Sequence, residues 1–316
     1  MQVIIDKGIP FLEGVFPPEI EVLHLSPEEI TPQTVRNADA LFVRTRTKIN
    51  KDLLHDSHVR FVATATIGFD HIDQNYCREA GIHWVSCPGC NAQAVCDYIE
   101  EAILSMKSGK TDQTIGIVGY GYVGKLVAKM AQDKGYRVLL SDPPLGIGSS
   151  LEELAPQCDI LTFHTPLTRS GNHPTLHLCD AHILSLCKPD ALIINAARGG
   201  VIDEQALIAQ LSHTNCQLST AIDCWENEPY LNHQLLQLTN LASFHIAGYS
   251  IEGKMRASEM CLEAFCKFFS LPILSINKKV VPLHGDSDSG WLQRISNQLK
   301  AQPEQFEQLR KQYKLR

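Results

Sequence analysis

The chain has 316 residues, of which 44% are hydrophobic and 20% charged, a profile typical of a globular protein with room for two domains. Its formal net charge of −7 provides no electrostatic reason to bind nucleic acid or an anionic membrane surface. No apolar run reaches the roughly 18 residues that cross a bilayer, and Asp6 and Lys7 follow the N-terminus too closely for a signal peptide, so we expect a cytoplasmic protein.

The first part of the chain shows the pattern of a small α/β unit. Runs rich in β-branched residues at positions 3–6, 40–44 and 60–67 predict strands, and polar or helical stretches separate them. Apolar residues at helical spacing over residues 92–107 predict a helix that ends before Gly109.

A series of alternating strands and helices follows. Strands are predicted at residues 114–118, 137–141, 160–163, 191–195, 218–222 and 241–243, with helices at 123–133 and 203–211. Such alternation predicts a parallel sheet that is doubly wound, with helices on both faces. A long helix at residues 251–269 is expected to return the chain to the first unit. Residues 271–316 hold a turn-rich stretch at 285–290 and a charged tail from 299 onward.

The first chemical motif is a glycine triplet between a predicted strand and a predicted helix. Gly119, Gly121 and Gly124 form G-x-G-x-x-G, which permits a tight turn, a close approach of pyrophosphate and close helix packing. Asp142 ends the next predicted strand, where a carboxylate binds ribose hydroxyls and repels a 2′-phosphate. The motif therefore predicts NAD rather than NADP, although a glycine turn without a ligand has the same pattern.

Three polar residues follow predicted strands of the second unit, at the edge where sites form in open α/β sheets. They are Arg198, Glu228 and His245. A histidine can accept the proton of a secondary alcohol, a carboxylate beside it orients the ring, and an arginine can hold a substrate carboxylate. Each residue alone also has a structural explanation, as a core histidine, a loop cap or an ion pair. Their combination after a dinucleotide motif favours a dehydrogenase.

The motifs GYGYVG, INAARGGVID, DCWENEP and HIAGYS resemble those of the D-2-hydroxyacid dehydrogenase family over residues 1 to about 270. The resemblance implies that Arg198 binds substrate and that Glu228 supports His245 as the acid–base. It also implies a Rossmann-type NAD domain, residues 92–249, inserted in a flavodoxin-like substrate-binding domain, residues 1–91 and 250–270. Residues 271–316 would be a short C-terminal extension, interpreted as a reduced dimerisation segment of a homodimer.

Finer motifs resemble a member of that family whose substrate is a phosphorylated D-2-hydroxy acid, oxidised at C2 in vitamin B6 synthesis. They include VRTRTKIN at 43–50, FVATATIGFDHID at 61–73 and HIAGYSIEGKMR at 245–256. This resemblance implies that substrate is contacted by Thr45, Thr66 and Tyr249. It further implies that the cofactor is lined, beside the glycines, by Tyr122, Val123, Asp142, Thr165, Asp223 and Gly248.

A phosphorylated substrate requires cations, and two clusters are candidates. Arg44, Arg46 and Lys48 alternate after a predicted strand, so their side chains could share a face. Lys254 and Arg256 follow Tyr249 closely. Both clusters are equally compatible with solvated surface charge.

Other functions remain open at this point. The chain could act on 3-phosphoglycerate or an unphosphorylated hydroxy acid, or it could be a non-catalytic NAD-sensing protein. The presence of Arg198, Glu228 and His245 together favours catalysis over sensing. The 11 cysteines are expected to be reduced thiols. Cys87 and Cys90 form a single C-x-x-C, so we expect no metal site, and a redox role stays open.

Overall fold

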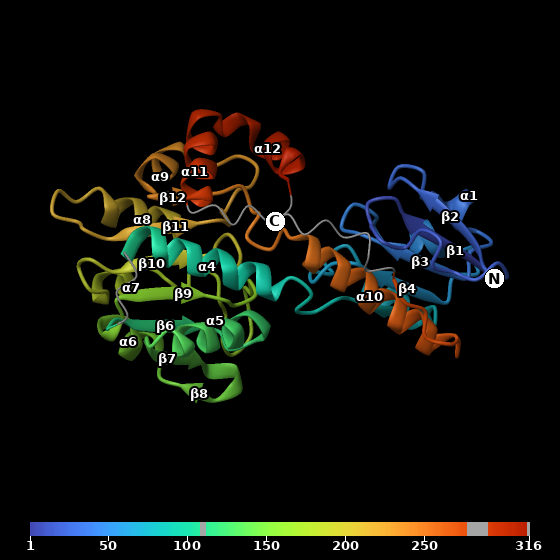
Figure 1. The fold of residues 1–316 in the computed structure, drawn as a ribbon, viewed down its shortest axis with the longest axis horizontal. Helices are drawn as coiled ribbons and strands as arrows, with labels where there is room; N and C mark the ends of the chain where they lie inside the picture. Colours follow the sequence, from blue (N-terminus) through green and yellow to red (C-terminus); the bar gives the residue numbers. More distant parts are fainter. Residues whose placement is uncertain (108–111, 277–289, 315–316) are drawn as a thin grey trace. The chain divides into compact units, whose positions relative to one another are not determined.

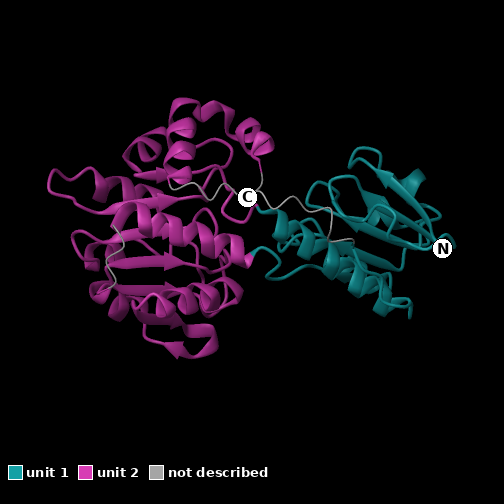
Figure 2. Ribbon diagram, in the orientation of Figure 1, with its two compact units in different colours: residues 1–91, 250–284 teal, residues 92–249, 285–316 magenta. Residues whose placement is uncertain are grey.

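The structure is a computed structural model that describes residues 1–107, 112–276 and 290–314. It divides into two compact units: unit 1 is residues 1–91 and 250–284, and unit 2 is residues 92–249 and 285–316 (Figure 2). Within the described stretches, none of the helices combines the length and apolarity that crossing a bilayer requires.

Unit 1 contains a five-stranded parallel sheet with the order β2-β1-β3-β4-β5 (Figure 1). Its strands are β1 (Gln2–Asp6), β2 (Glu21–Leu25), β3 (Ala40–Val43), β4 (Phe61–Thr64) and β5 (His83–Val85). This is the flavodoxin-like doubly wound order, as the family resemblance implied. The sequence patterns located β1, β3 and β4 but missed β2 and β5. These two are edge strands whose side chains are only partly buried, so they lack a continuous apolar run.

Alternation along the strands of unit 1 divides its core into two layers. Val3, Phe42 and Phe61 pack against α10 (Ile251–Phe268), which arrives from the far end of the sequence. Ile4 and Leu41 point to the opposite face. The helices of unit 1 on this second side are α1 (Pro32–Val35), α2 (Lys51–Leu54) and α3 (Gln74–Glu79). The predicted long helix therefore completes the first unit.

Unit 2 contains a seven-stranded sheet with the order β12-β11-β10-β9-β6-β7-β8. Its strands are β6 (Thr114–Val118), β7 (Arg137–Asp142), β8 (Ile147–Gly148), β9 (Ile160–Phe163), β10 (Leu192–Asn195), β11 (Ser219–Ile222) and β12 (Leu241–Ala242). All pairs are parallel except β7 with β8, a short antiparallel edge that the sequence did not predict. The strand order reverses between β6 and β9, which is where ligands bind in such sheets.

Helices cover both faces of the unit 2 sheet. α4 (Ala92–Lys107) packs against α5 (Tyr122–Asp133) on one face. α6 (Leu151–Leu154), α7 (Ala181–Leu186), α8 (Glu204–Leu211) and α9 (His233–Leu238) contact one another in that order. The strand order runs in one direction from β6 and in the other from β9. Because the crossover connections are right-handed, the helices on the two sides lie on opposite faces of the sheet. Short 3₁₀ turns lie at η1 (Pro143–Leu145) and η2 (Ala155–Gln157).

The C-terminal segment differs from the predicted charged tail. It forms α11 (Trp291–Ala301), η4 (Pro303–Gln305) and α12 (Phe306–Gln312), which belong to unit 2. Leu292, Leu299 and Phe306 are fully buried and recur every seven residues among mostly polar ones, so the composition concealed one apolar face. Ser296 Oγ accepts the Ala242 amide at 2.9 Å. α11 therefore covers the edge strand β12, which removes an exposed sheet edge. The turn-rich stretch at 285–290 lies outside the described residues apart from Gly290.

Because Phe306 is 0% exposed, Phe306→Ala should lower the free energy of unfolding of unit 2 by about 3–5 kcal/mol, through lost burial and a residual cavity. Urea unfolding followed by tryptophan fluorescence measures it. Tyr230→Ala is the control, since that aromatic side chain is 84% exposed. Equal stability of both variants would mean that α12 is not part of the folded core.

Candidate active site

The glycine triplet forms a cradle at the N-terminus of α5. Gly119 has φ +93°, a conformation that side-chain-bearing residues rarely adopt. A Cβ on Gly124 would lie 2.0 Å from the Gly119 carbonyl oxygen, whereas one on Gly121 would meet nothing within 4 Å. The turn is thus tightly closed on its inner side and open at Gly121, where the helix begins with exposed Tyr122 and half-buried Val123. Free amides at a helix start suit a bound phosphate.

Asp142, at the end of β7, is tied to this turn. Its Oδ2 accepts the Tyr120 amide at 2.7 Å, and its Oδ1 accepts the Leu145 amide at 3.3 Å. The carboxylate remains partly exposed beside the glycine cradle. It is therefore held in one orientation, with lone pairs still available to ribose hydroxyls.

Two side chains after β9 have buried polar atoms without a partner among the described residues. They are Thr165 Oγ1 and His164 Nδ1. Burial lowers the pKa of His164 to about 3, so its ring is neutral. Unpaired buried polar atoms are costly, and a bound ligand is one way to satisfy them. The glycine cradle, Asp142 and Thr165 together fit a dinucleotide.

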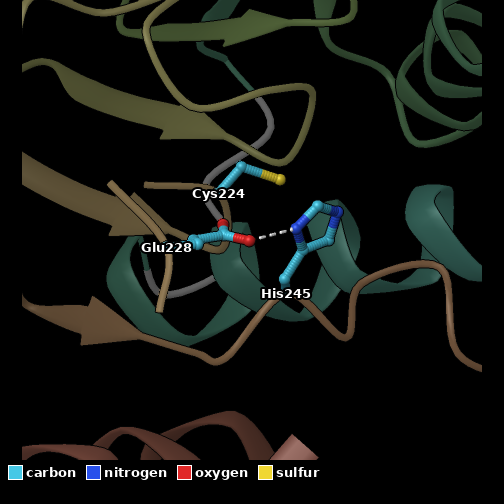
Figure 3. A group of neighbouring side chains, drawn as sticks. All are labelled: Cys224, Glu228 and His245. Atoms are coloured by element: carbon cyan, nitrogen blue, oxygen red, sulfur yellow. Dashed lines mark hydrogen bonds and ion pairs between the residues drawn. The ribbon is translucent and has the colours of Figure 1, made fainter. Parts of the chain in front are cut away.

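His245 and Glu228 form a hydrogen-bonded pair. Glu228 Oε2 lies 2.8 Å from His245 Nδ1, and the side chains are 18% and 31% exposed (Figure 3). Glu228 Oε1 accepts the Trp225 amide at 2.9 Å, which fixes the carboxylate on its own loop. The other ring nitrogen, Nε2, is left as the atom that can exchange a proton with a substrate.

The loop that carries His245 is braced by the buried carboxylate of Asp223, which is 1% exposed. Asp223 Oδ1 accepts the Ser243 hydroxyl at 2.6 Å and the Ile246 amide at 2.8 Å. Asp223 Oδ2 accepts the Ala247 amide at 2.9 Å. Asp223 was predicted as a cofactor residue. In this structure both of its carboxylate oxygens accept hydrogen bonds from the loop that carries His245.

This bracing has two consequences for the loop. His245 takes φ +59°, a conformation that only surrounding bonds can hold in a residue other than glycine. The chain then turns through Gly248, and the Tyr249 amide donates to the Ile246 carbonyl at 2.8 Å. Tyr249 is thereby placed four residues beyond the histidine, on the same short turn.

The pKa of His245 is raised well above its ordinary value. The Cys224 sulfur beside the ring and the hydrogen-bonded Glu228 carboxylate act in this direction, and burial opposes them (Figure 3). Burial also raises the pKa of the Cys224 thiol, so that thiol is neutral near pH 7. We therefore assign the stabilisation of the imidazolium to the hydrogen-bonded Glu228 carboxylate.

Arg198 lies on the loop after β10, next to the loop that bears Glu228. Its Nη1 donates to the Ala197 carbonyl at 2.7 Å, and the residue is exposed. Asn195 Nδ2 donates to the carbonyl oxygens of Arg198 at 3.0 Å and Cys224 at 3.3 Å. The side-chain amide of Asn195 therefore joins the two loops, and Arg198 lies at the same edge of the sheet as Glu228.

The residues assigned to substrate fall in both units. In unit 1, Thr45 is exposed in the turn after β3. Thr66 Oγ1 donates to the Gly68 carbonyl at 2.8 Å and lies 2.7 Å from Thr64 Oγ1. In unit 2, the hydroxyl of Tyr249 accepts a hydrogen bond from Arg310 Nε at 3.0 Å.

Sequence reasoning missed Arg310, which comes from α12. Its guanidinium carbon lies 5.6 Å from the centre of the Tyr249 ring. Burial lowers the pKa of Arg310, but Tyr249 and the charge of Glu228 outweigh it and the pKa is raised. The signal available was the helical pattern of residues 303–313, hidden within the charged tail. Arg310 thus adds positive charge to the surroundings of Glu228.

Two groups among the described residues place three possible metal ligands within 4.8 Å: Cys224 with Glu228 and His245, and His177 with Asp203 and Glu226. In the second group, His177 Nε2 lies 3.1 Å from Glu226 Oε1 and Nδ1 lies 3.7 Å from Asp203 Oδ2. In both groups a histidine nitrogen already faces a carboxylate. Contacts between a histidine ring and a carboxylate therefore account for both groups, and the second group anchors the start of the Glu228 loop.

Comparison with known proteins adds independent findings. The model of the D-isomer specific 2-hydroxyacid dehydrogenase NAD-binding domain matches residues 99–247. Erythronate-4-phosphate dehydrogenase of Bacteroides thetaiotaomicron is 42% identical, over 100% of this chain and 97% of the relative. The enzyme of that name from Cronobacter sakazakii is 38% identical, over 100% and 92%. The crystal structure of Rhodotorula graminis D-mandelate dehydrogenase is 23% identical, covers 89% of this chain and 98% of its own, and has a TM-score of 0.71, which supports the fold.

Glu228→Gln should lower the pKa of His245, because the amide keeps a hydrogen-bonding group beside Nδ1 but removes the charge that favours the imidazolium. An NMR titration of the histidine ring signals measures this. Cys224→Ala is the comparison variant and should leave a raised pKa, since its thiol is uncharged near neutral pH. A larger fall in Cys224→Ala than in Glu228→Gln would assign the effect to the sulfur.

Proposed function

This chain belongs to the D-isomer-specific 2-hydroxyacid dehydrogenase family, and we propose that it oxidises 4-phospho-D-erythronate at C2, with NAD as hydride acceptor. The product is 2-oxo-3-hydroxy-4-phosphobutanoate, on the route to pyridoxal phosphate. The observation that carries the substrate assignment is the full-length identity of 42% and 38% to enzymes named for it. The hydrogen-bonded Glu228–His245 pair supports the chemistry.

In the proposed mechanism, His245 is the acid–base. During oxidation neutral Nε2 accepts the proton of the C2 hydroxyl, and Glu228 stabilises the imidazolium that forms through Nδ1. The raised pKa of His245 makes it a ready proton acceptor once neutral, and a good donor in the reverse direction. The role of the Asp223 bracing is to hold the ring where this transfer can occur.

We assign the substrate carboxylate to Arg198. A guanidinium can hold a carboxylate with two parallel N–H donors, and it can also polarise the oxygen at C2 as the carbonyl forms. Thr45, Thr66 and Tyr249 are proposed to bind the remaining hydroxyl and phosphate-bearing part of the substrate. Because the Tyr249 oxygen accepts from Arg310, its own hydrogen is directed away from that arginine and can be donated.

NAD supplies the hydride acceptor. The groups proposed to hold it are the amides at the cradle of Gly119, Gly121 and Gly124, with Tyr122 and Val123 at the start of the helix. Asp142 would bind the adenosine ribose. The buried hydroxyl of Thr165 would form a hydrogen bond with the cofactor. We further propose that Asp223 and Gly248 line the nicotinamide end, through the loop that they shape.

The alternatives are less well supported. A family member acting on 3-phosphoglycerate or an unphosphorylated acid would not be expected to match erythronate-4-phosphate dehydrogenases along its whole length. A protein that only senses NAD has no need for a paired His245 and Glu228 (Figure 3).

We also propose that the protein is a cytoplasmic homodimer. All 11 cysteines are free, which suits a reducing compartment. The dimer proposal rests on the resemblance of the C-terminal segment to part of the family's dimerisation domain. Sedimentation analysis of the purified chain tests it.

Turnover of a substrate panel tests the function. Reduction of NAD is followed by absorbance with 4-phospho-D-erythronate, D-erythronate, 3-phospho-D-glycerate and D-lactate. We expect the highest kcat/KM with 4-phospho-D-erythronate. Preference for another acid would reassign the substrate, and no turnover of any acid despite NAD binding would favour sensing.

Replacement of the acid–base provides the first mechanistic prediction. His245→Asn should reduce kcat by about 10²- to 10⁴-fold, because proton transfer is lost. NAD affinity, measured by fluorescence titration, should stay close to that of the unmodified chain. In the unmodified chain, oxidation should rise with pH through the raised pKa of His245, since only the neutral ring accepts a proton. Near-normal kcat in the variant would remove His245 from the mechanism.

Replacement of the ribose-binding acid tests cofactor choice. Asp142→Asn keeps an oxygen that can accept the Tyr120 amide but removes the charge that repels a 2′-phosphate. The preference for NAD over NADP, as a ratio of kcat/KM, should fall by about 10-fold, the size of one charged hydrogen bond. If the unmodified chain already used NADP equally well, Asp142 would not be the discriminating group.

A further inference from the structure

Ser243 connects the two loops that carry the acid–base pair. The residue directly follows β12 and is 0% exposed. Its hydroxyl donates to Asp223 Oδ1 at 2.6 Å, the carboxylate that braces the His245 loop. Its carbonyl oxygen accepts the indole N–H of Trp225 at 2.9 Å, and the Trp225 amide donates to Glu228 Oε1 at 2.9 Å. A shift of Ser243 is therefore transmitted to both His245 and Glu228.

A second buried hydroxyl reaches Ser243 from α4. Tyr98 is 0% exposed, and its hydroxyl oxygen lies 2.9 Å from Ser243 Oγ. A serine hydroxyl has a single hydrogen, and Ser243 donates its own to the Asp223 carboxylate, which can only accept. In the bond between the two hydroxyls, Tyr98 is therefore the donor. The hydrogen bonds run in one direction from Tyr98 through Ser243 to Asp223, and bonds aligned in this way strengthen one another.

The Tyr98 ring is held in place by packing in the core of unit 2. It meets the ring of Trp291, at the start of α11, edge to face, with ring centres 6.0 Å apart and an angle of 66° between the planes. Both rings belong to the same cluster of buried side chains. The position of the Tyr98 hydroxyl is therefore set by the helices α4 and α11.

Packing alone does not require a hydroxyl at this position. A phenylalanine would keep the ring and its contact with Trp291, whereas the buried hydroxyl of tyrosine loses its hydration on folding. The bond to Ser243 Oγ offsets that loss. What the hydroxyl adds beyond packing is thus a fixed direction for the Ser243 side chain, which in turn directs its hydrogen at Asp223.

We propose that Tyr98 and Ser243 form a positioning relay that holds Glu228 and His245 in the geometry for proton transfer (Figure 3). The proposal rests on the proposed function, because it concerns the residues assigned to the acid–base step. Without the Tyr98 hydroxyl, a lone pair of Ser243 Oγ loses its donor and the hold of Asp223 on the loop weakens. The bond between His245 Nδ1 and Glu228 is then formed for a smaller fraction of the time.

The test is Tyr98→Phe, which removes one oxygen and keeps the aromatic ring. With 4-phospho-D-erythronate, kcat should fall by about 3- to 10-fold, the size of one neutral hydrogen bond. KM and the NAD affinity should stay within about twofold, since no proposed substrate or cofactor contact is removed. An NMR titration should place the pKa of His245 below that of the unmodified chain, because its bond to Glu228 is weakened. The pH profile of oxidation should shift to lower pH in parallel.

A double-mutant cycle separates a relay from two independent effects. Ser243→Ala already disconnects Tyr98 from Asp223, so adding Tyr98→Phe to it should cause little further loss of kcat. Tyr136→Phe is the matched control, because Tyr136 is a buried tyrosine of the same core cluster. It should change neither kcat nor the pKa of His245. Thermal unfolding of each variant shows that the assays are made on folded protein, and Ser243→Ala tests the relay if Tyr98→Phe does not fold.

An unchanged kcat in Tyr98→Phe would overturn the relay and leave Tyr98 as a structural residue, whatever the stability of the variant. An unchanged pKa of His245 would do the same, as would losses of kcat that multiply in the double variant. If the unmodified chain does not oxidise 4-phospho-D-erythronate, the proposed function is rejected instead. The NMR titration needs no substrate, so it still decides on the relay in that case.

Discussion

The candidate site depends on one buried charge, the carboxylate of Asp223. A carboxylate that is 1% exposed is stable only if hydrogen bonds replace its lost hydration. The Ser243 hydroxyl and the amides of Ile246 and Ala247 provide them, so the loop between these residues cannot relax without leaving a charge unsatisfied. The left-handed backbone of His245 is a consequence, because strain at that residue is smaller than the cost of releasing the loop.

Other constraints around the site follow the same logic. The Asn195 side chain joins the Arg198 loop to the Cys224 loop, and a Cβ on Gly199 would lie 1.8 Å from the Trp225 carbonyl. Only glycine allows the two loops to approach this closely. The loops that carry Arg198 and Glu228 are thus held together by contacts of Asn195 and Gly199 with the neighbouring backbone. Within unit 2, Arg310 adds positive charge beside the Tyr249 hydroxyl.

The parts of the fold that sequence reasoning located are those with a strong local pattern. The helix at Ala92–Lys107 and the strands β6 and β9 were predicted to the residue, because their apolar residues are continuous or evenly spaced. The edge strands β2 and β5 were missed because their side chains are only partly buried, so their sequences lack a continuous apolar run. The helices after residue 290 were missed because polar and charged residues interrupt their buried positions, which leaves no continuous apolar run.

By itself, the sequence determined the α/β class, the glycine cradle with its acid at the end of the next strand, and the candidate acid–base histidine with its carboxylate. Each is encoded by residues close together in the chain or by a motif whose geometry is local. Only the tertiary structure decided that Asp223 supports the histidine loop and that Arg310 reaches Tyr249. These depend on contacts between residues 20 to 61 positions apart, which leave no trace in the local spacing of the sequence.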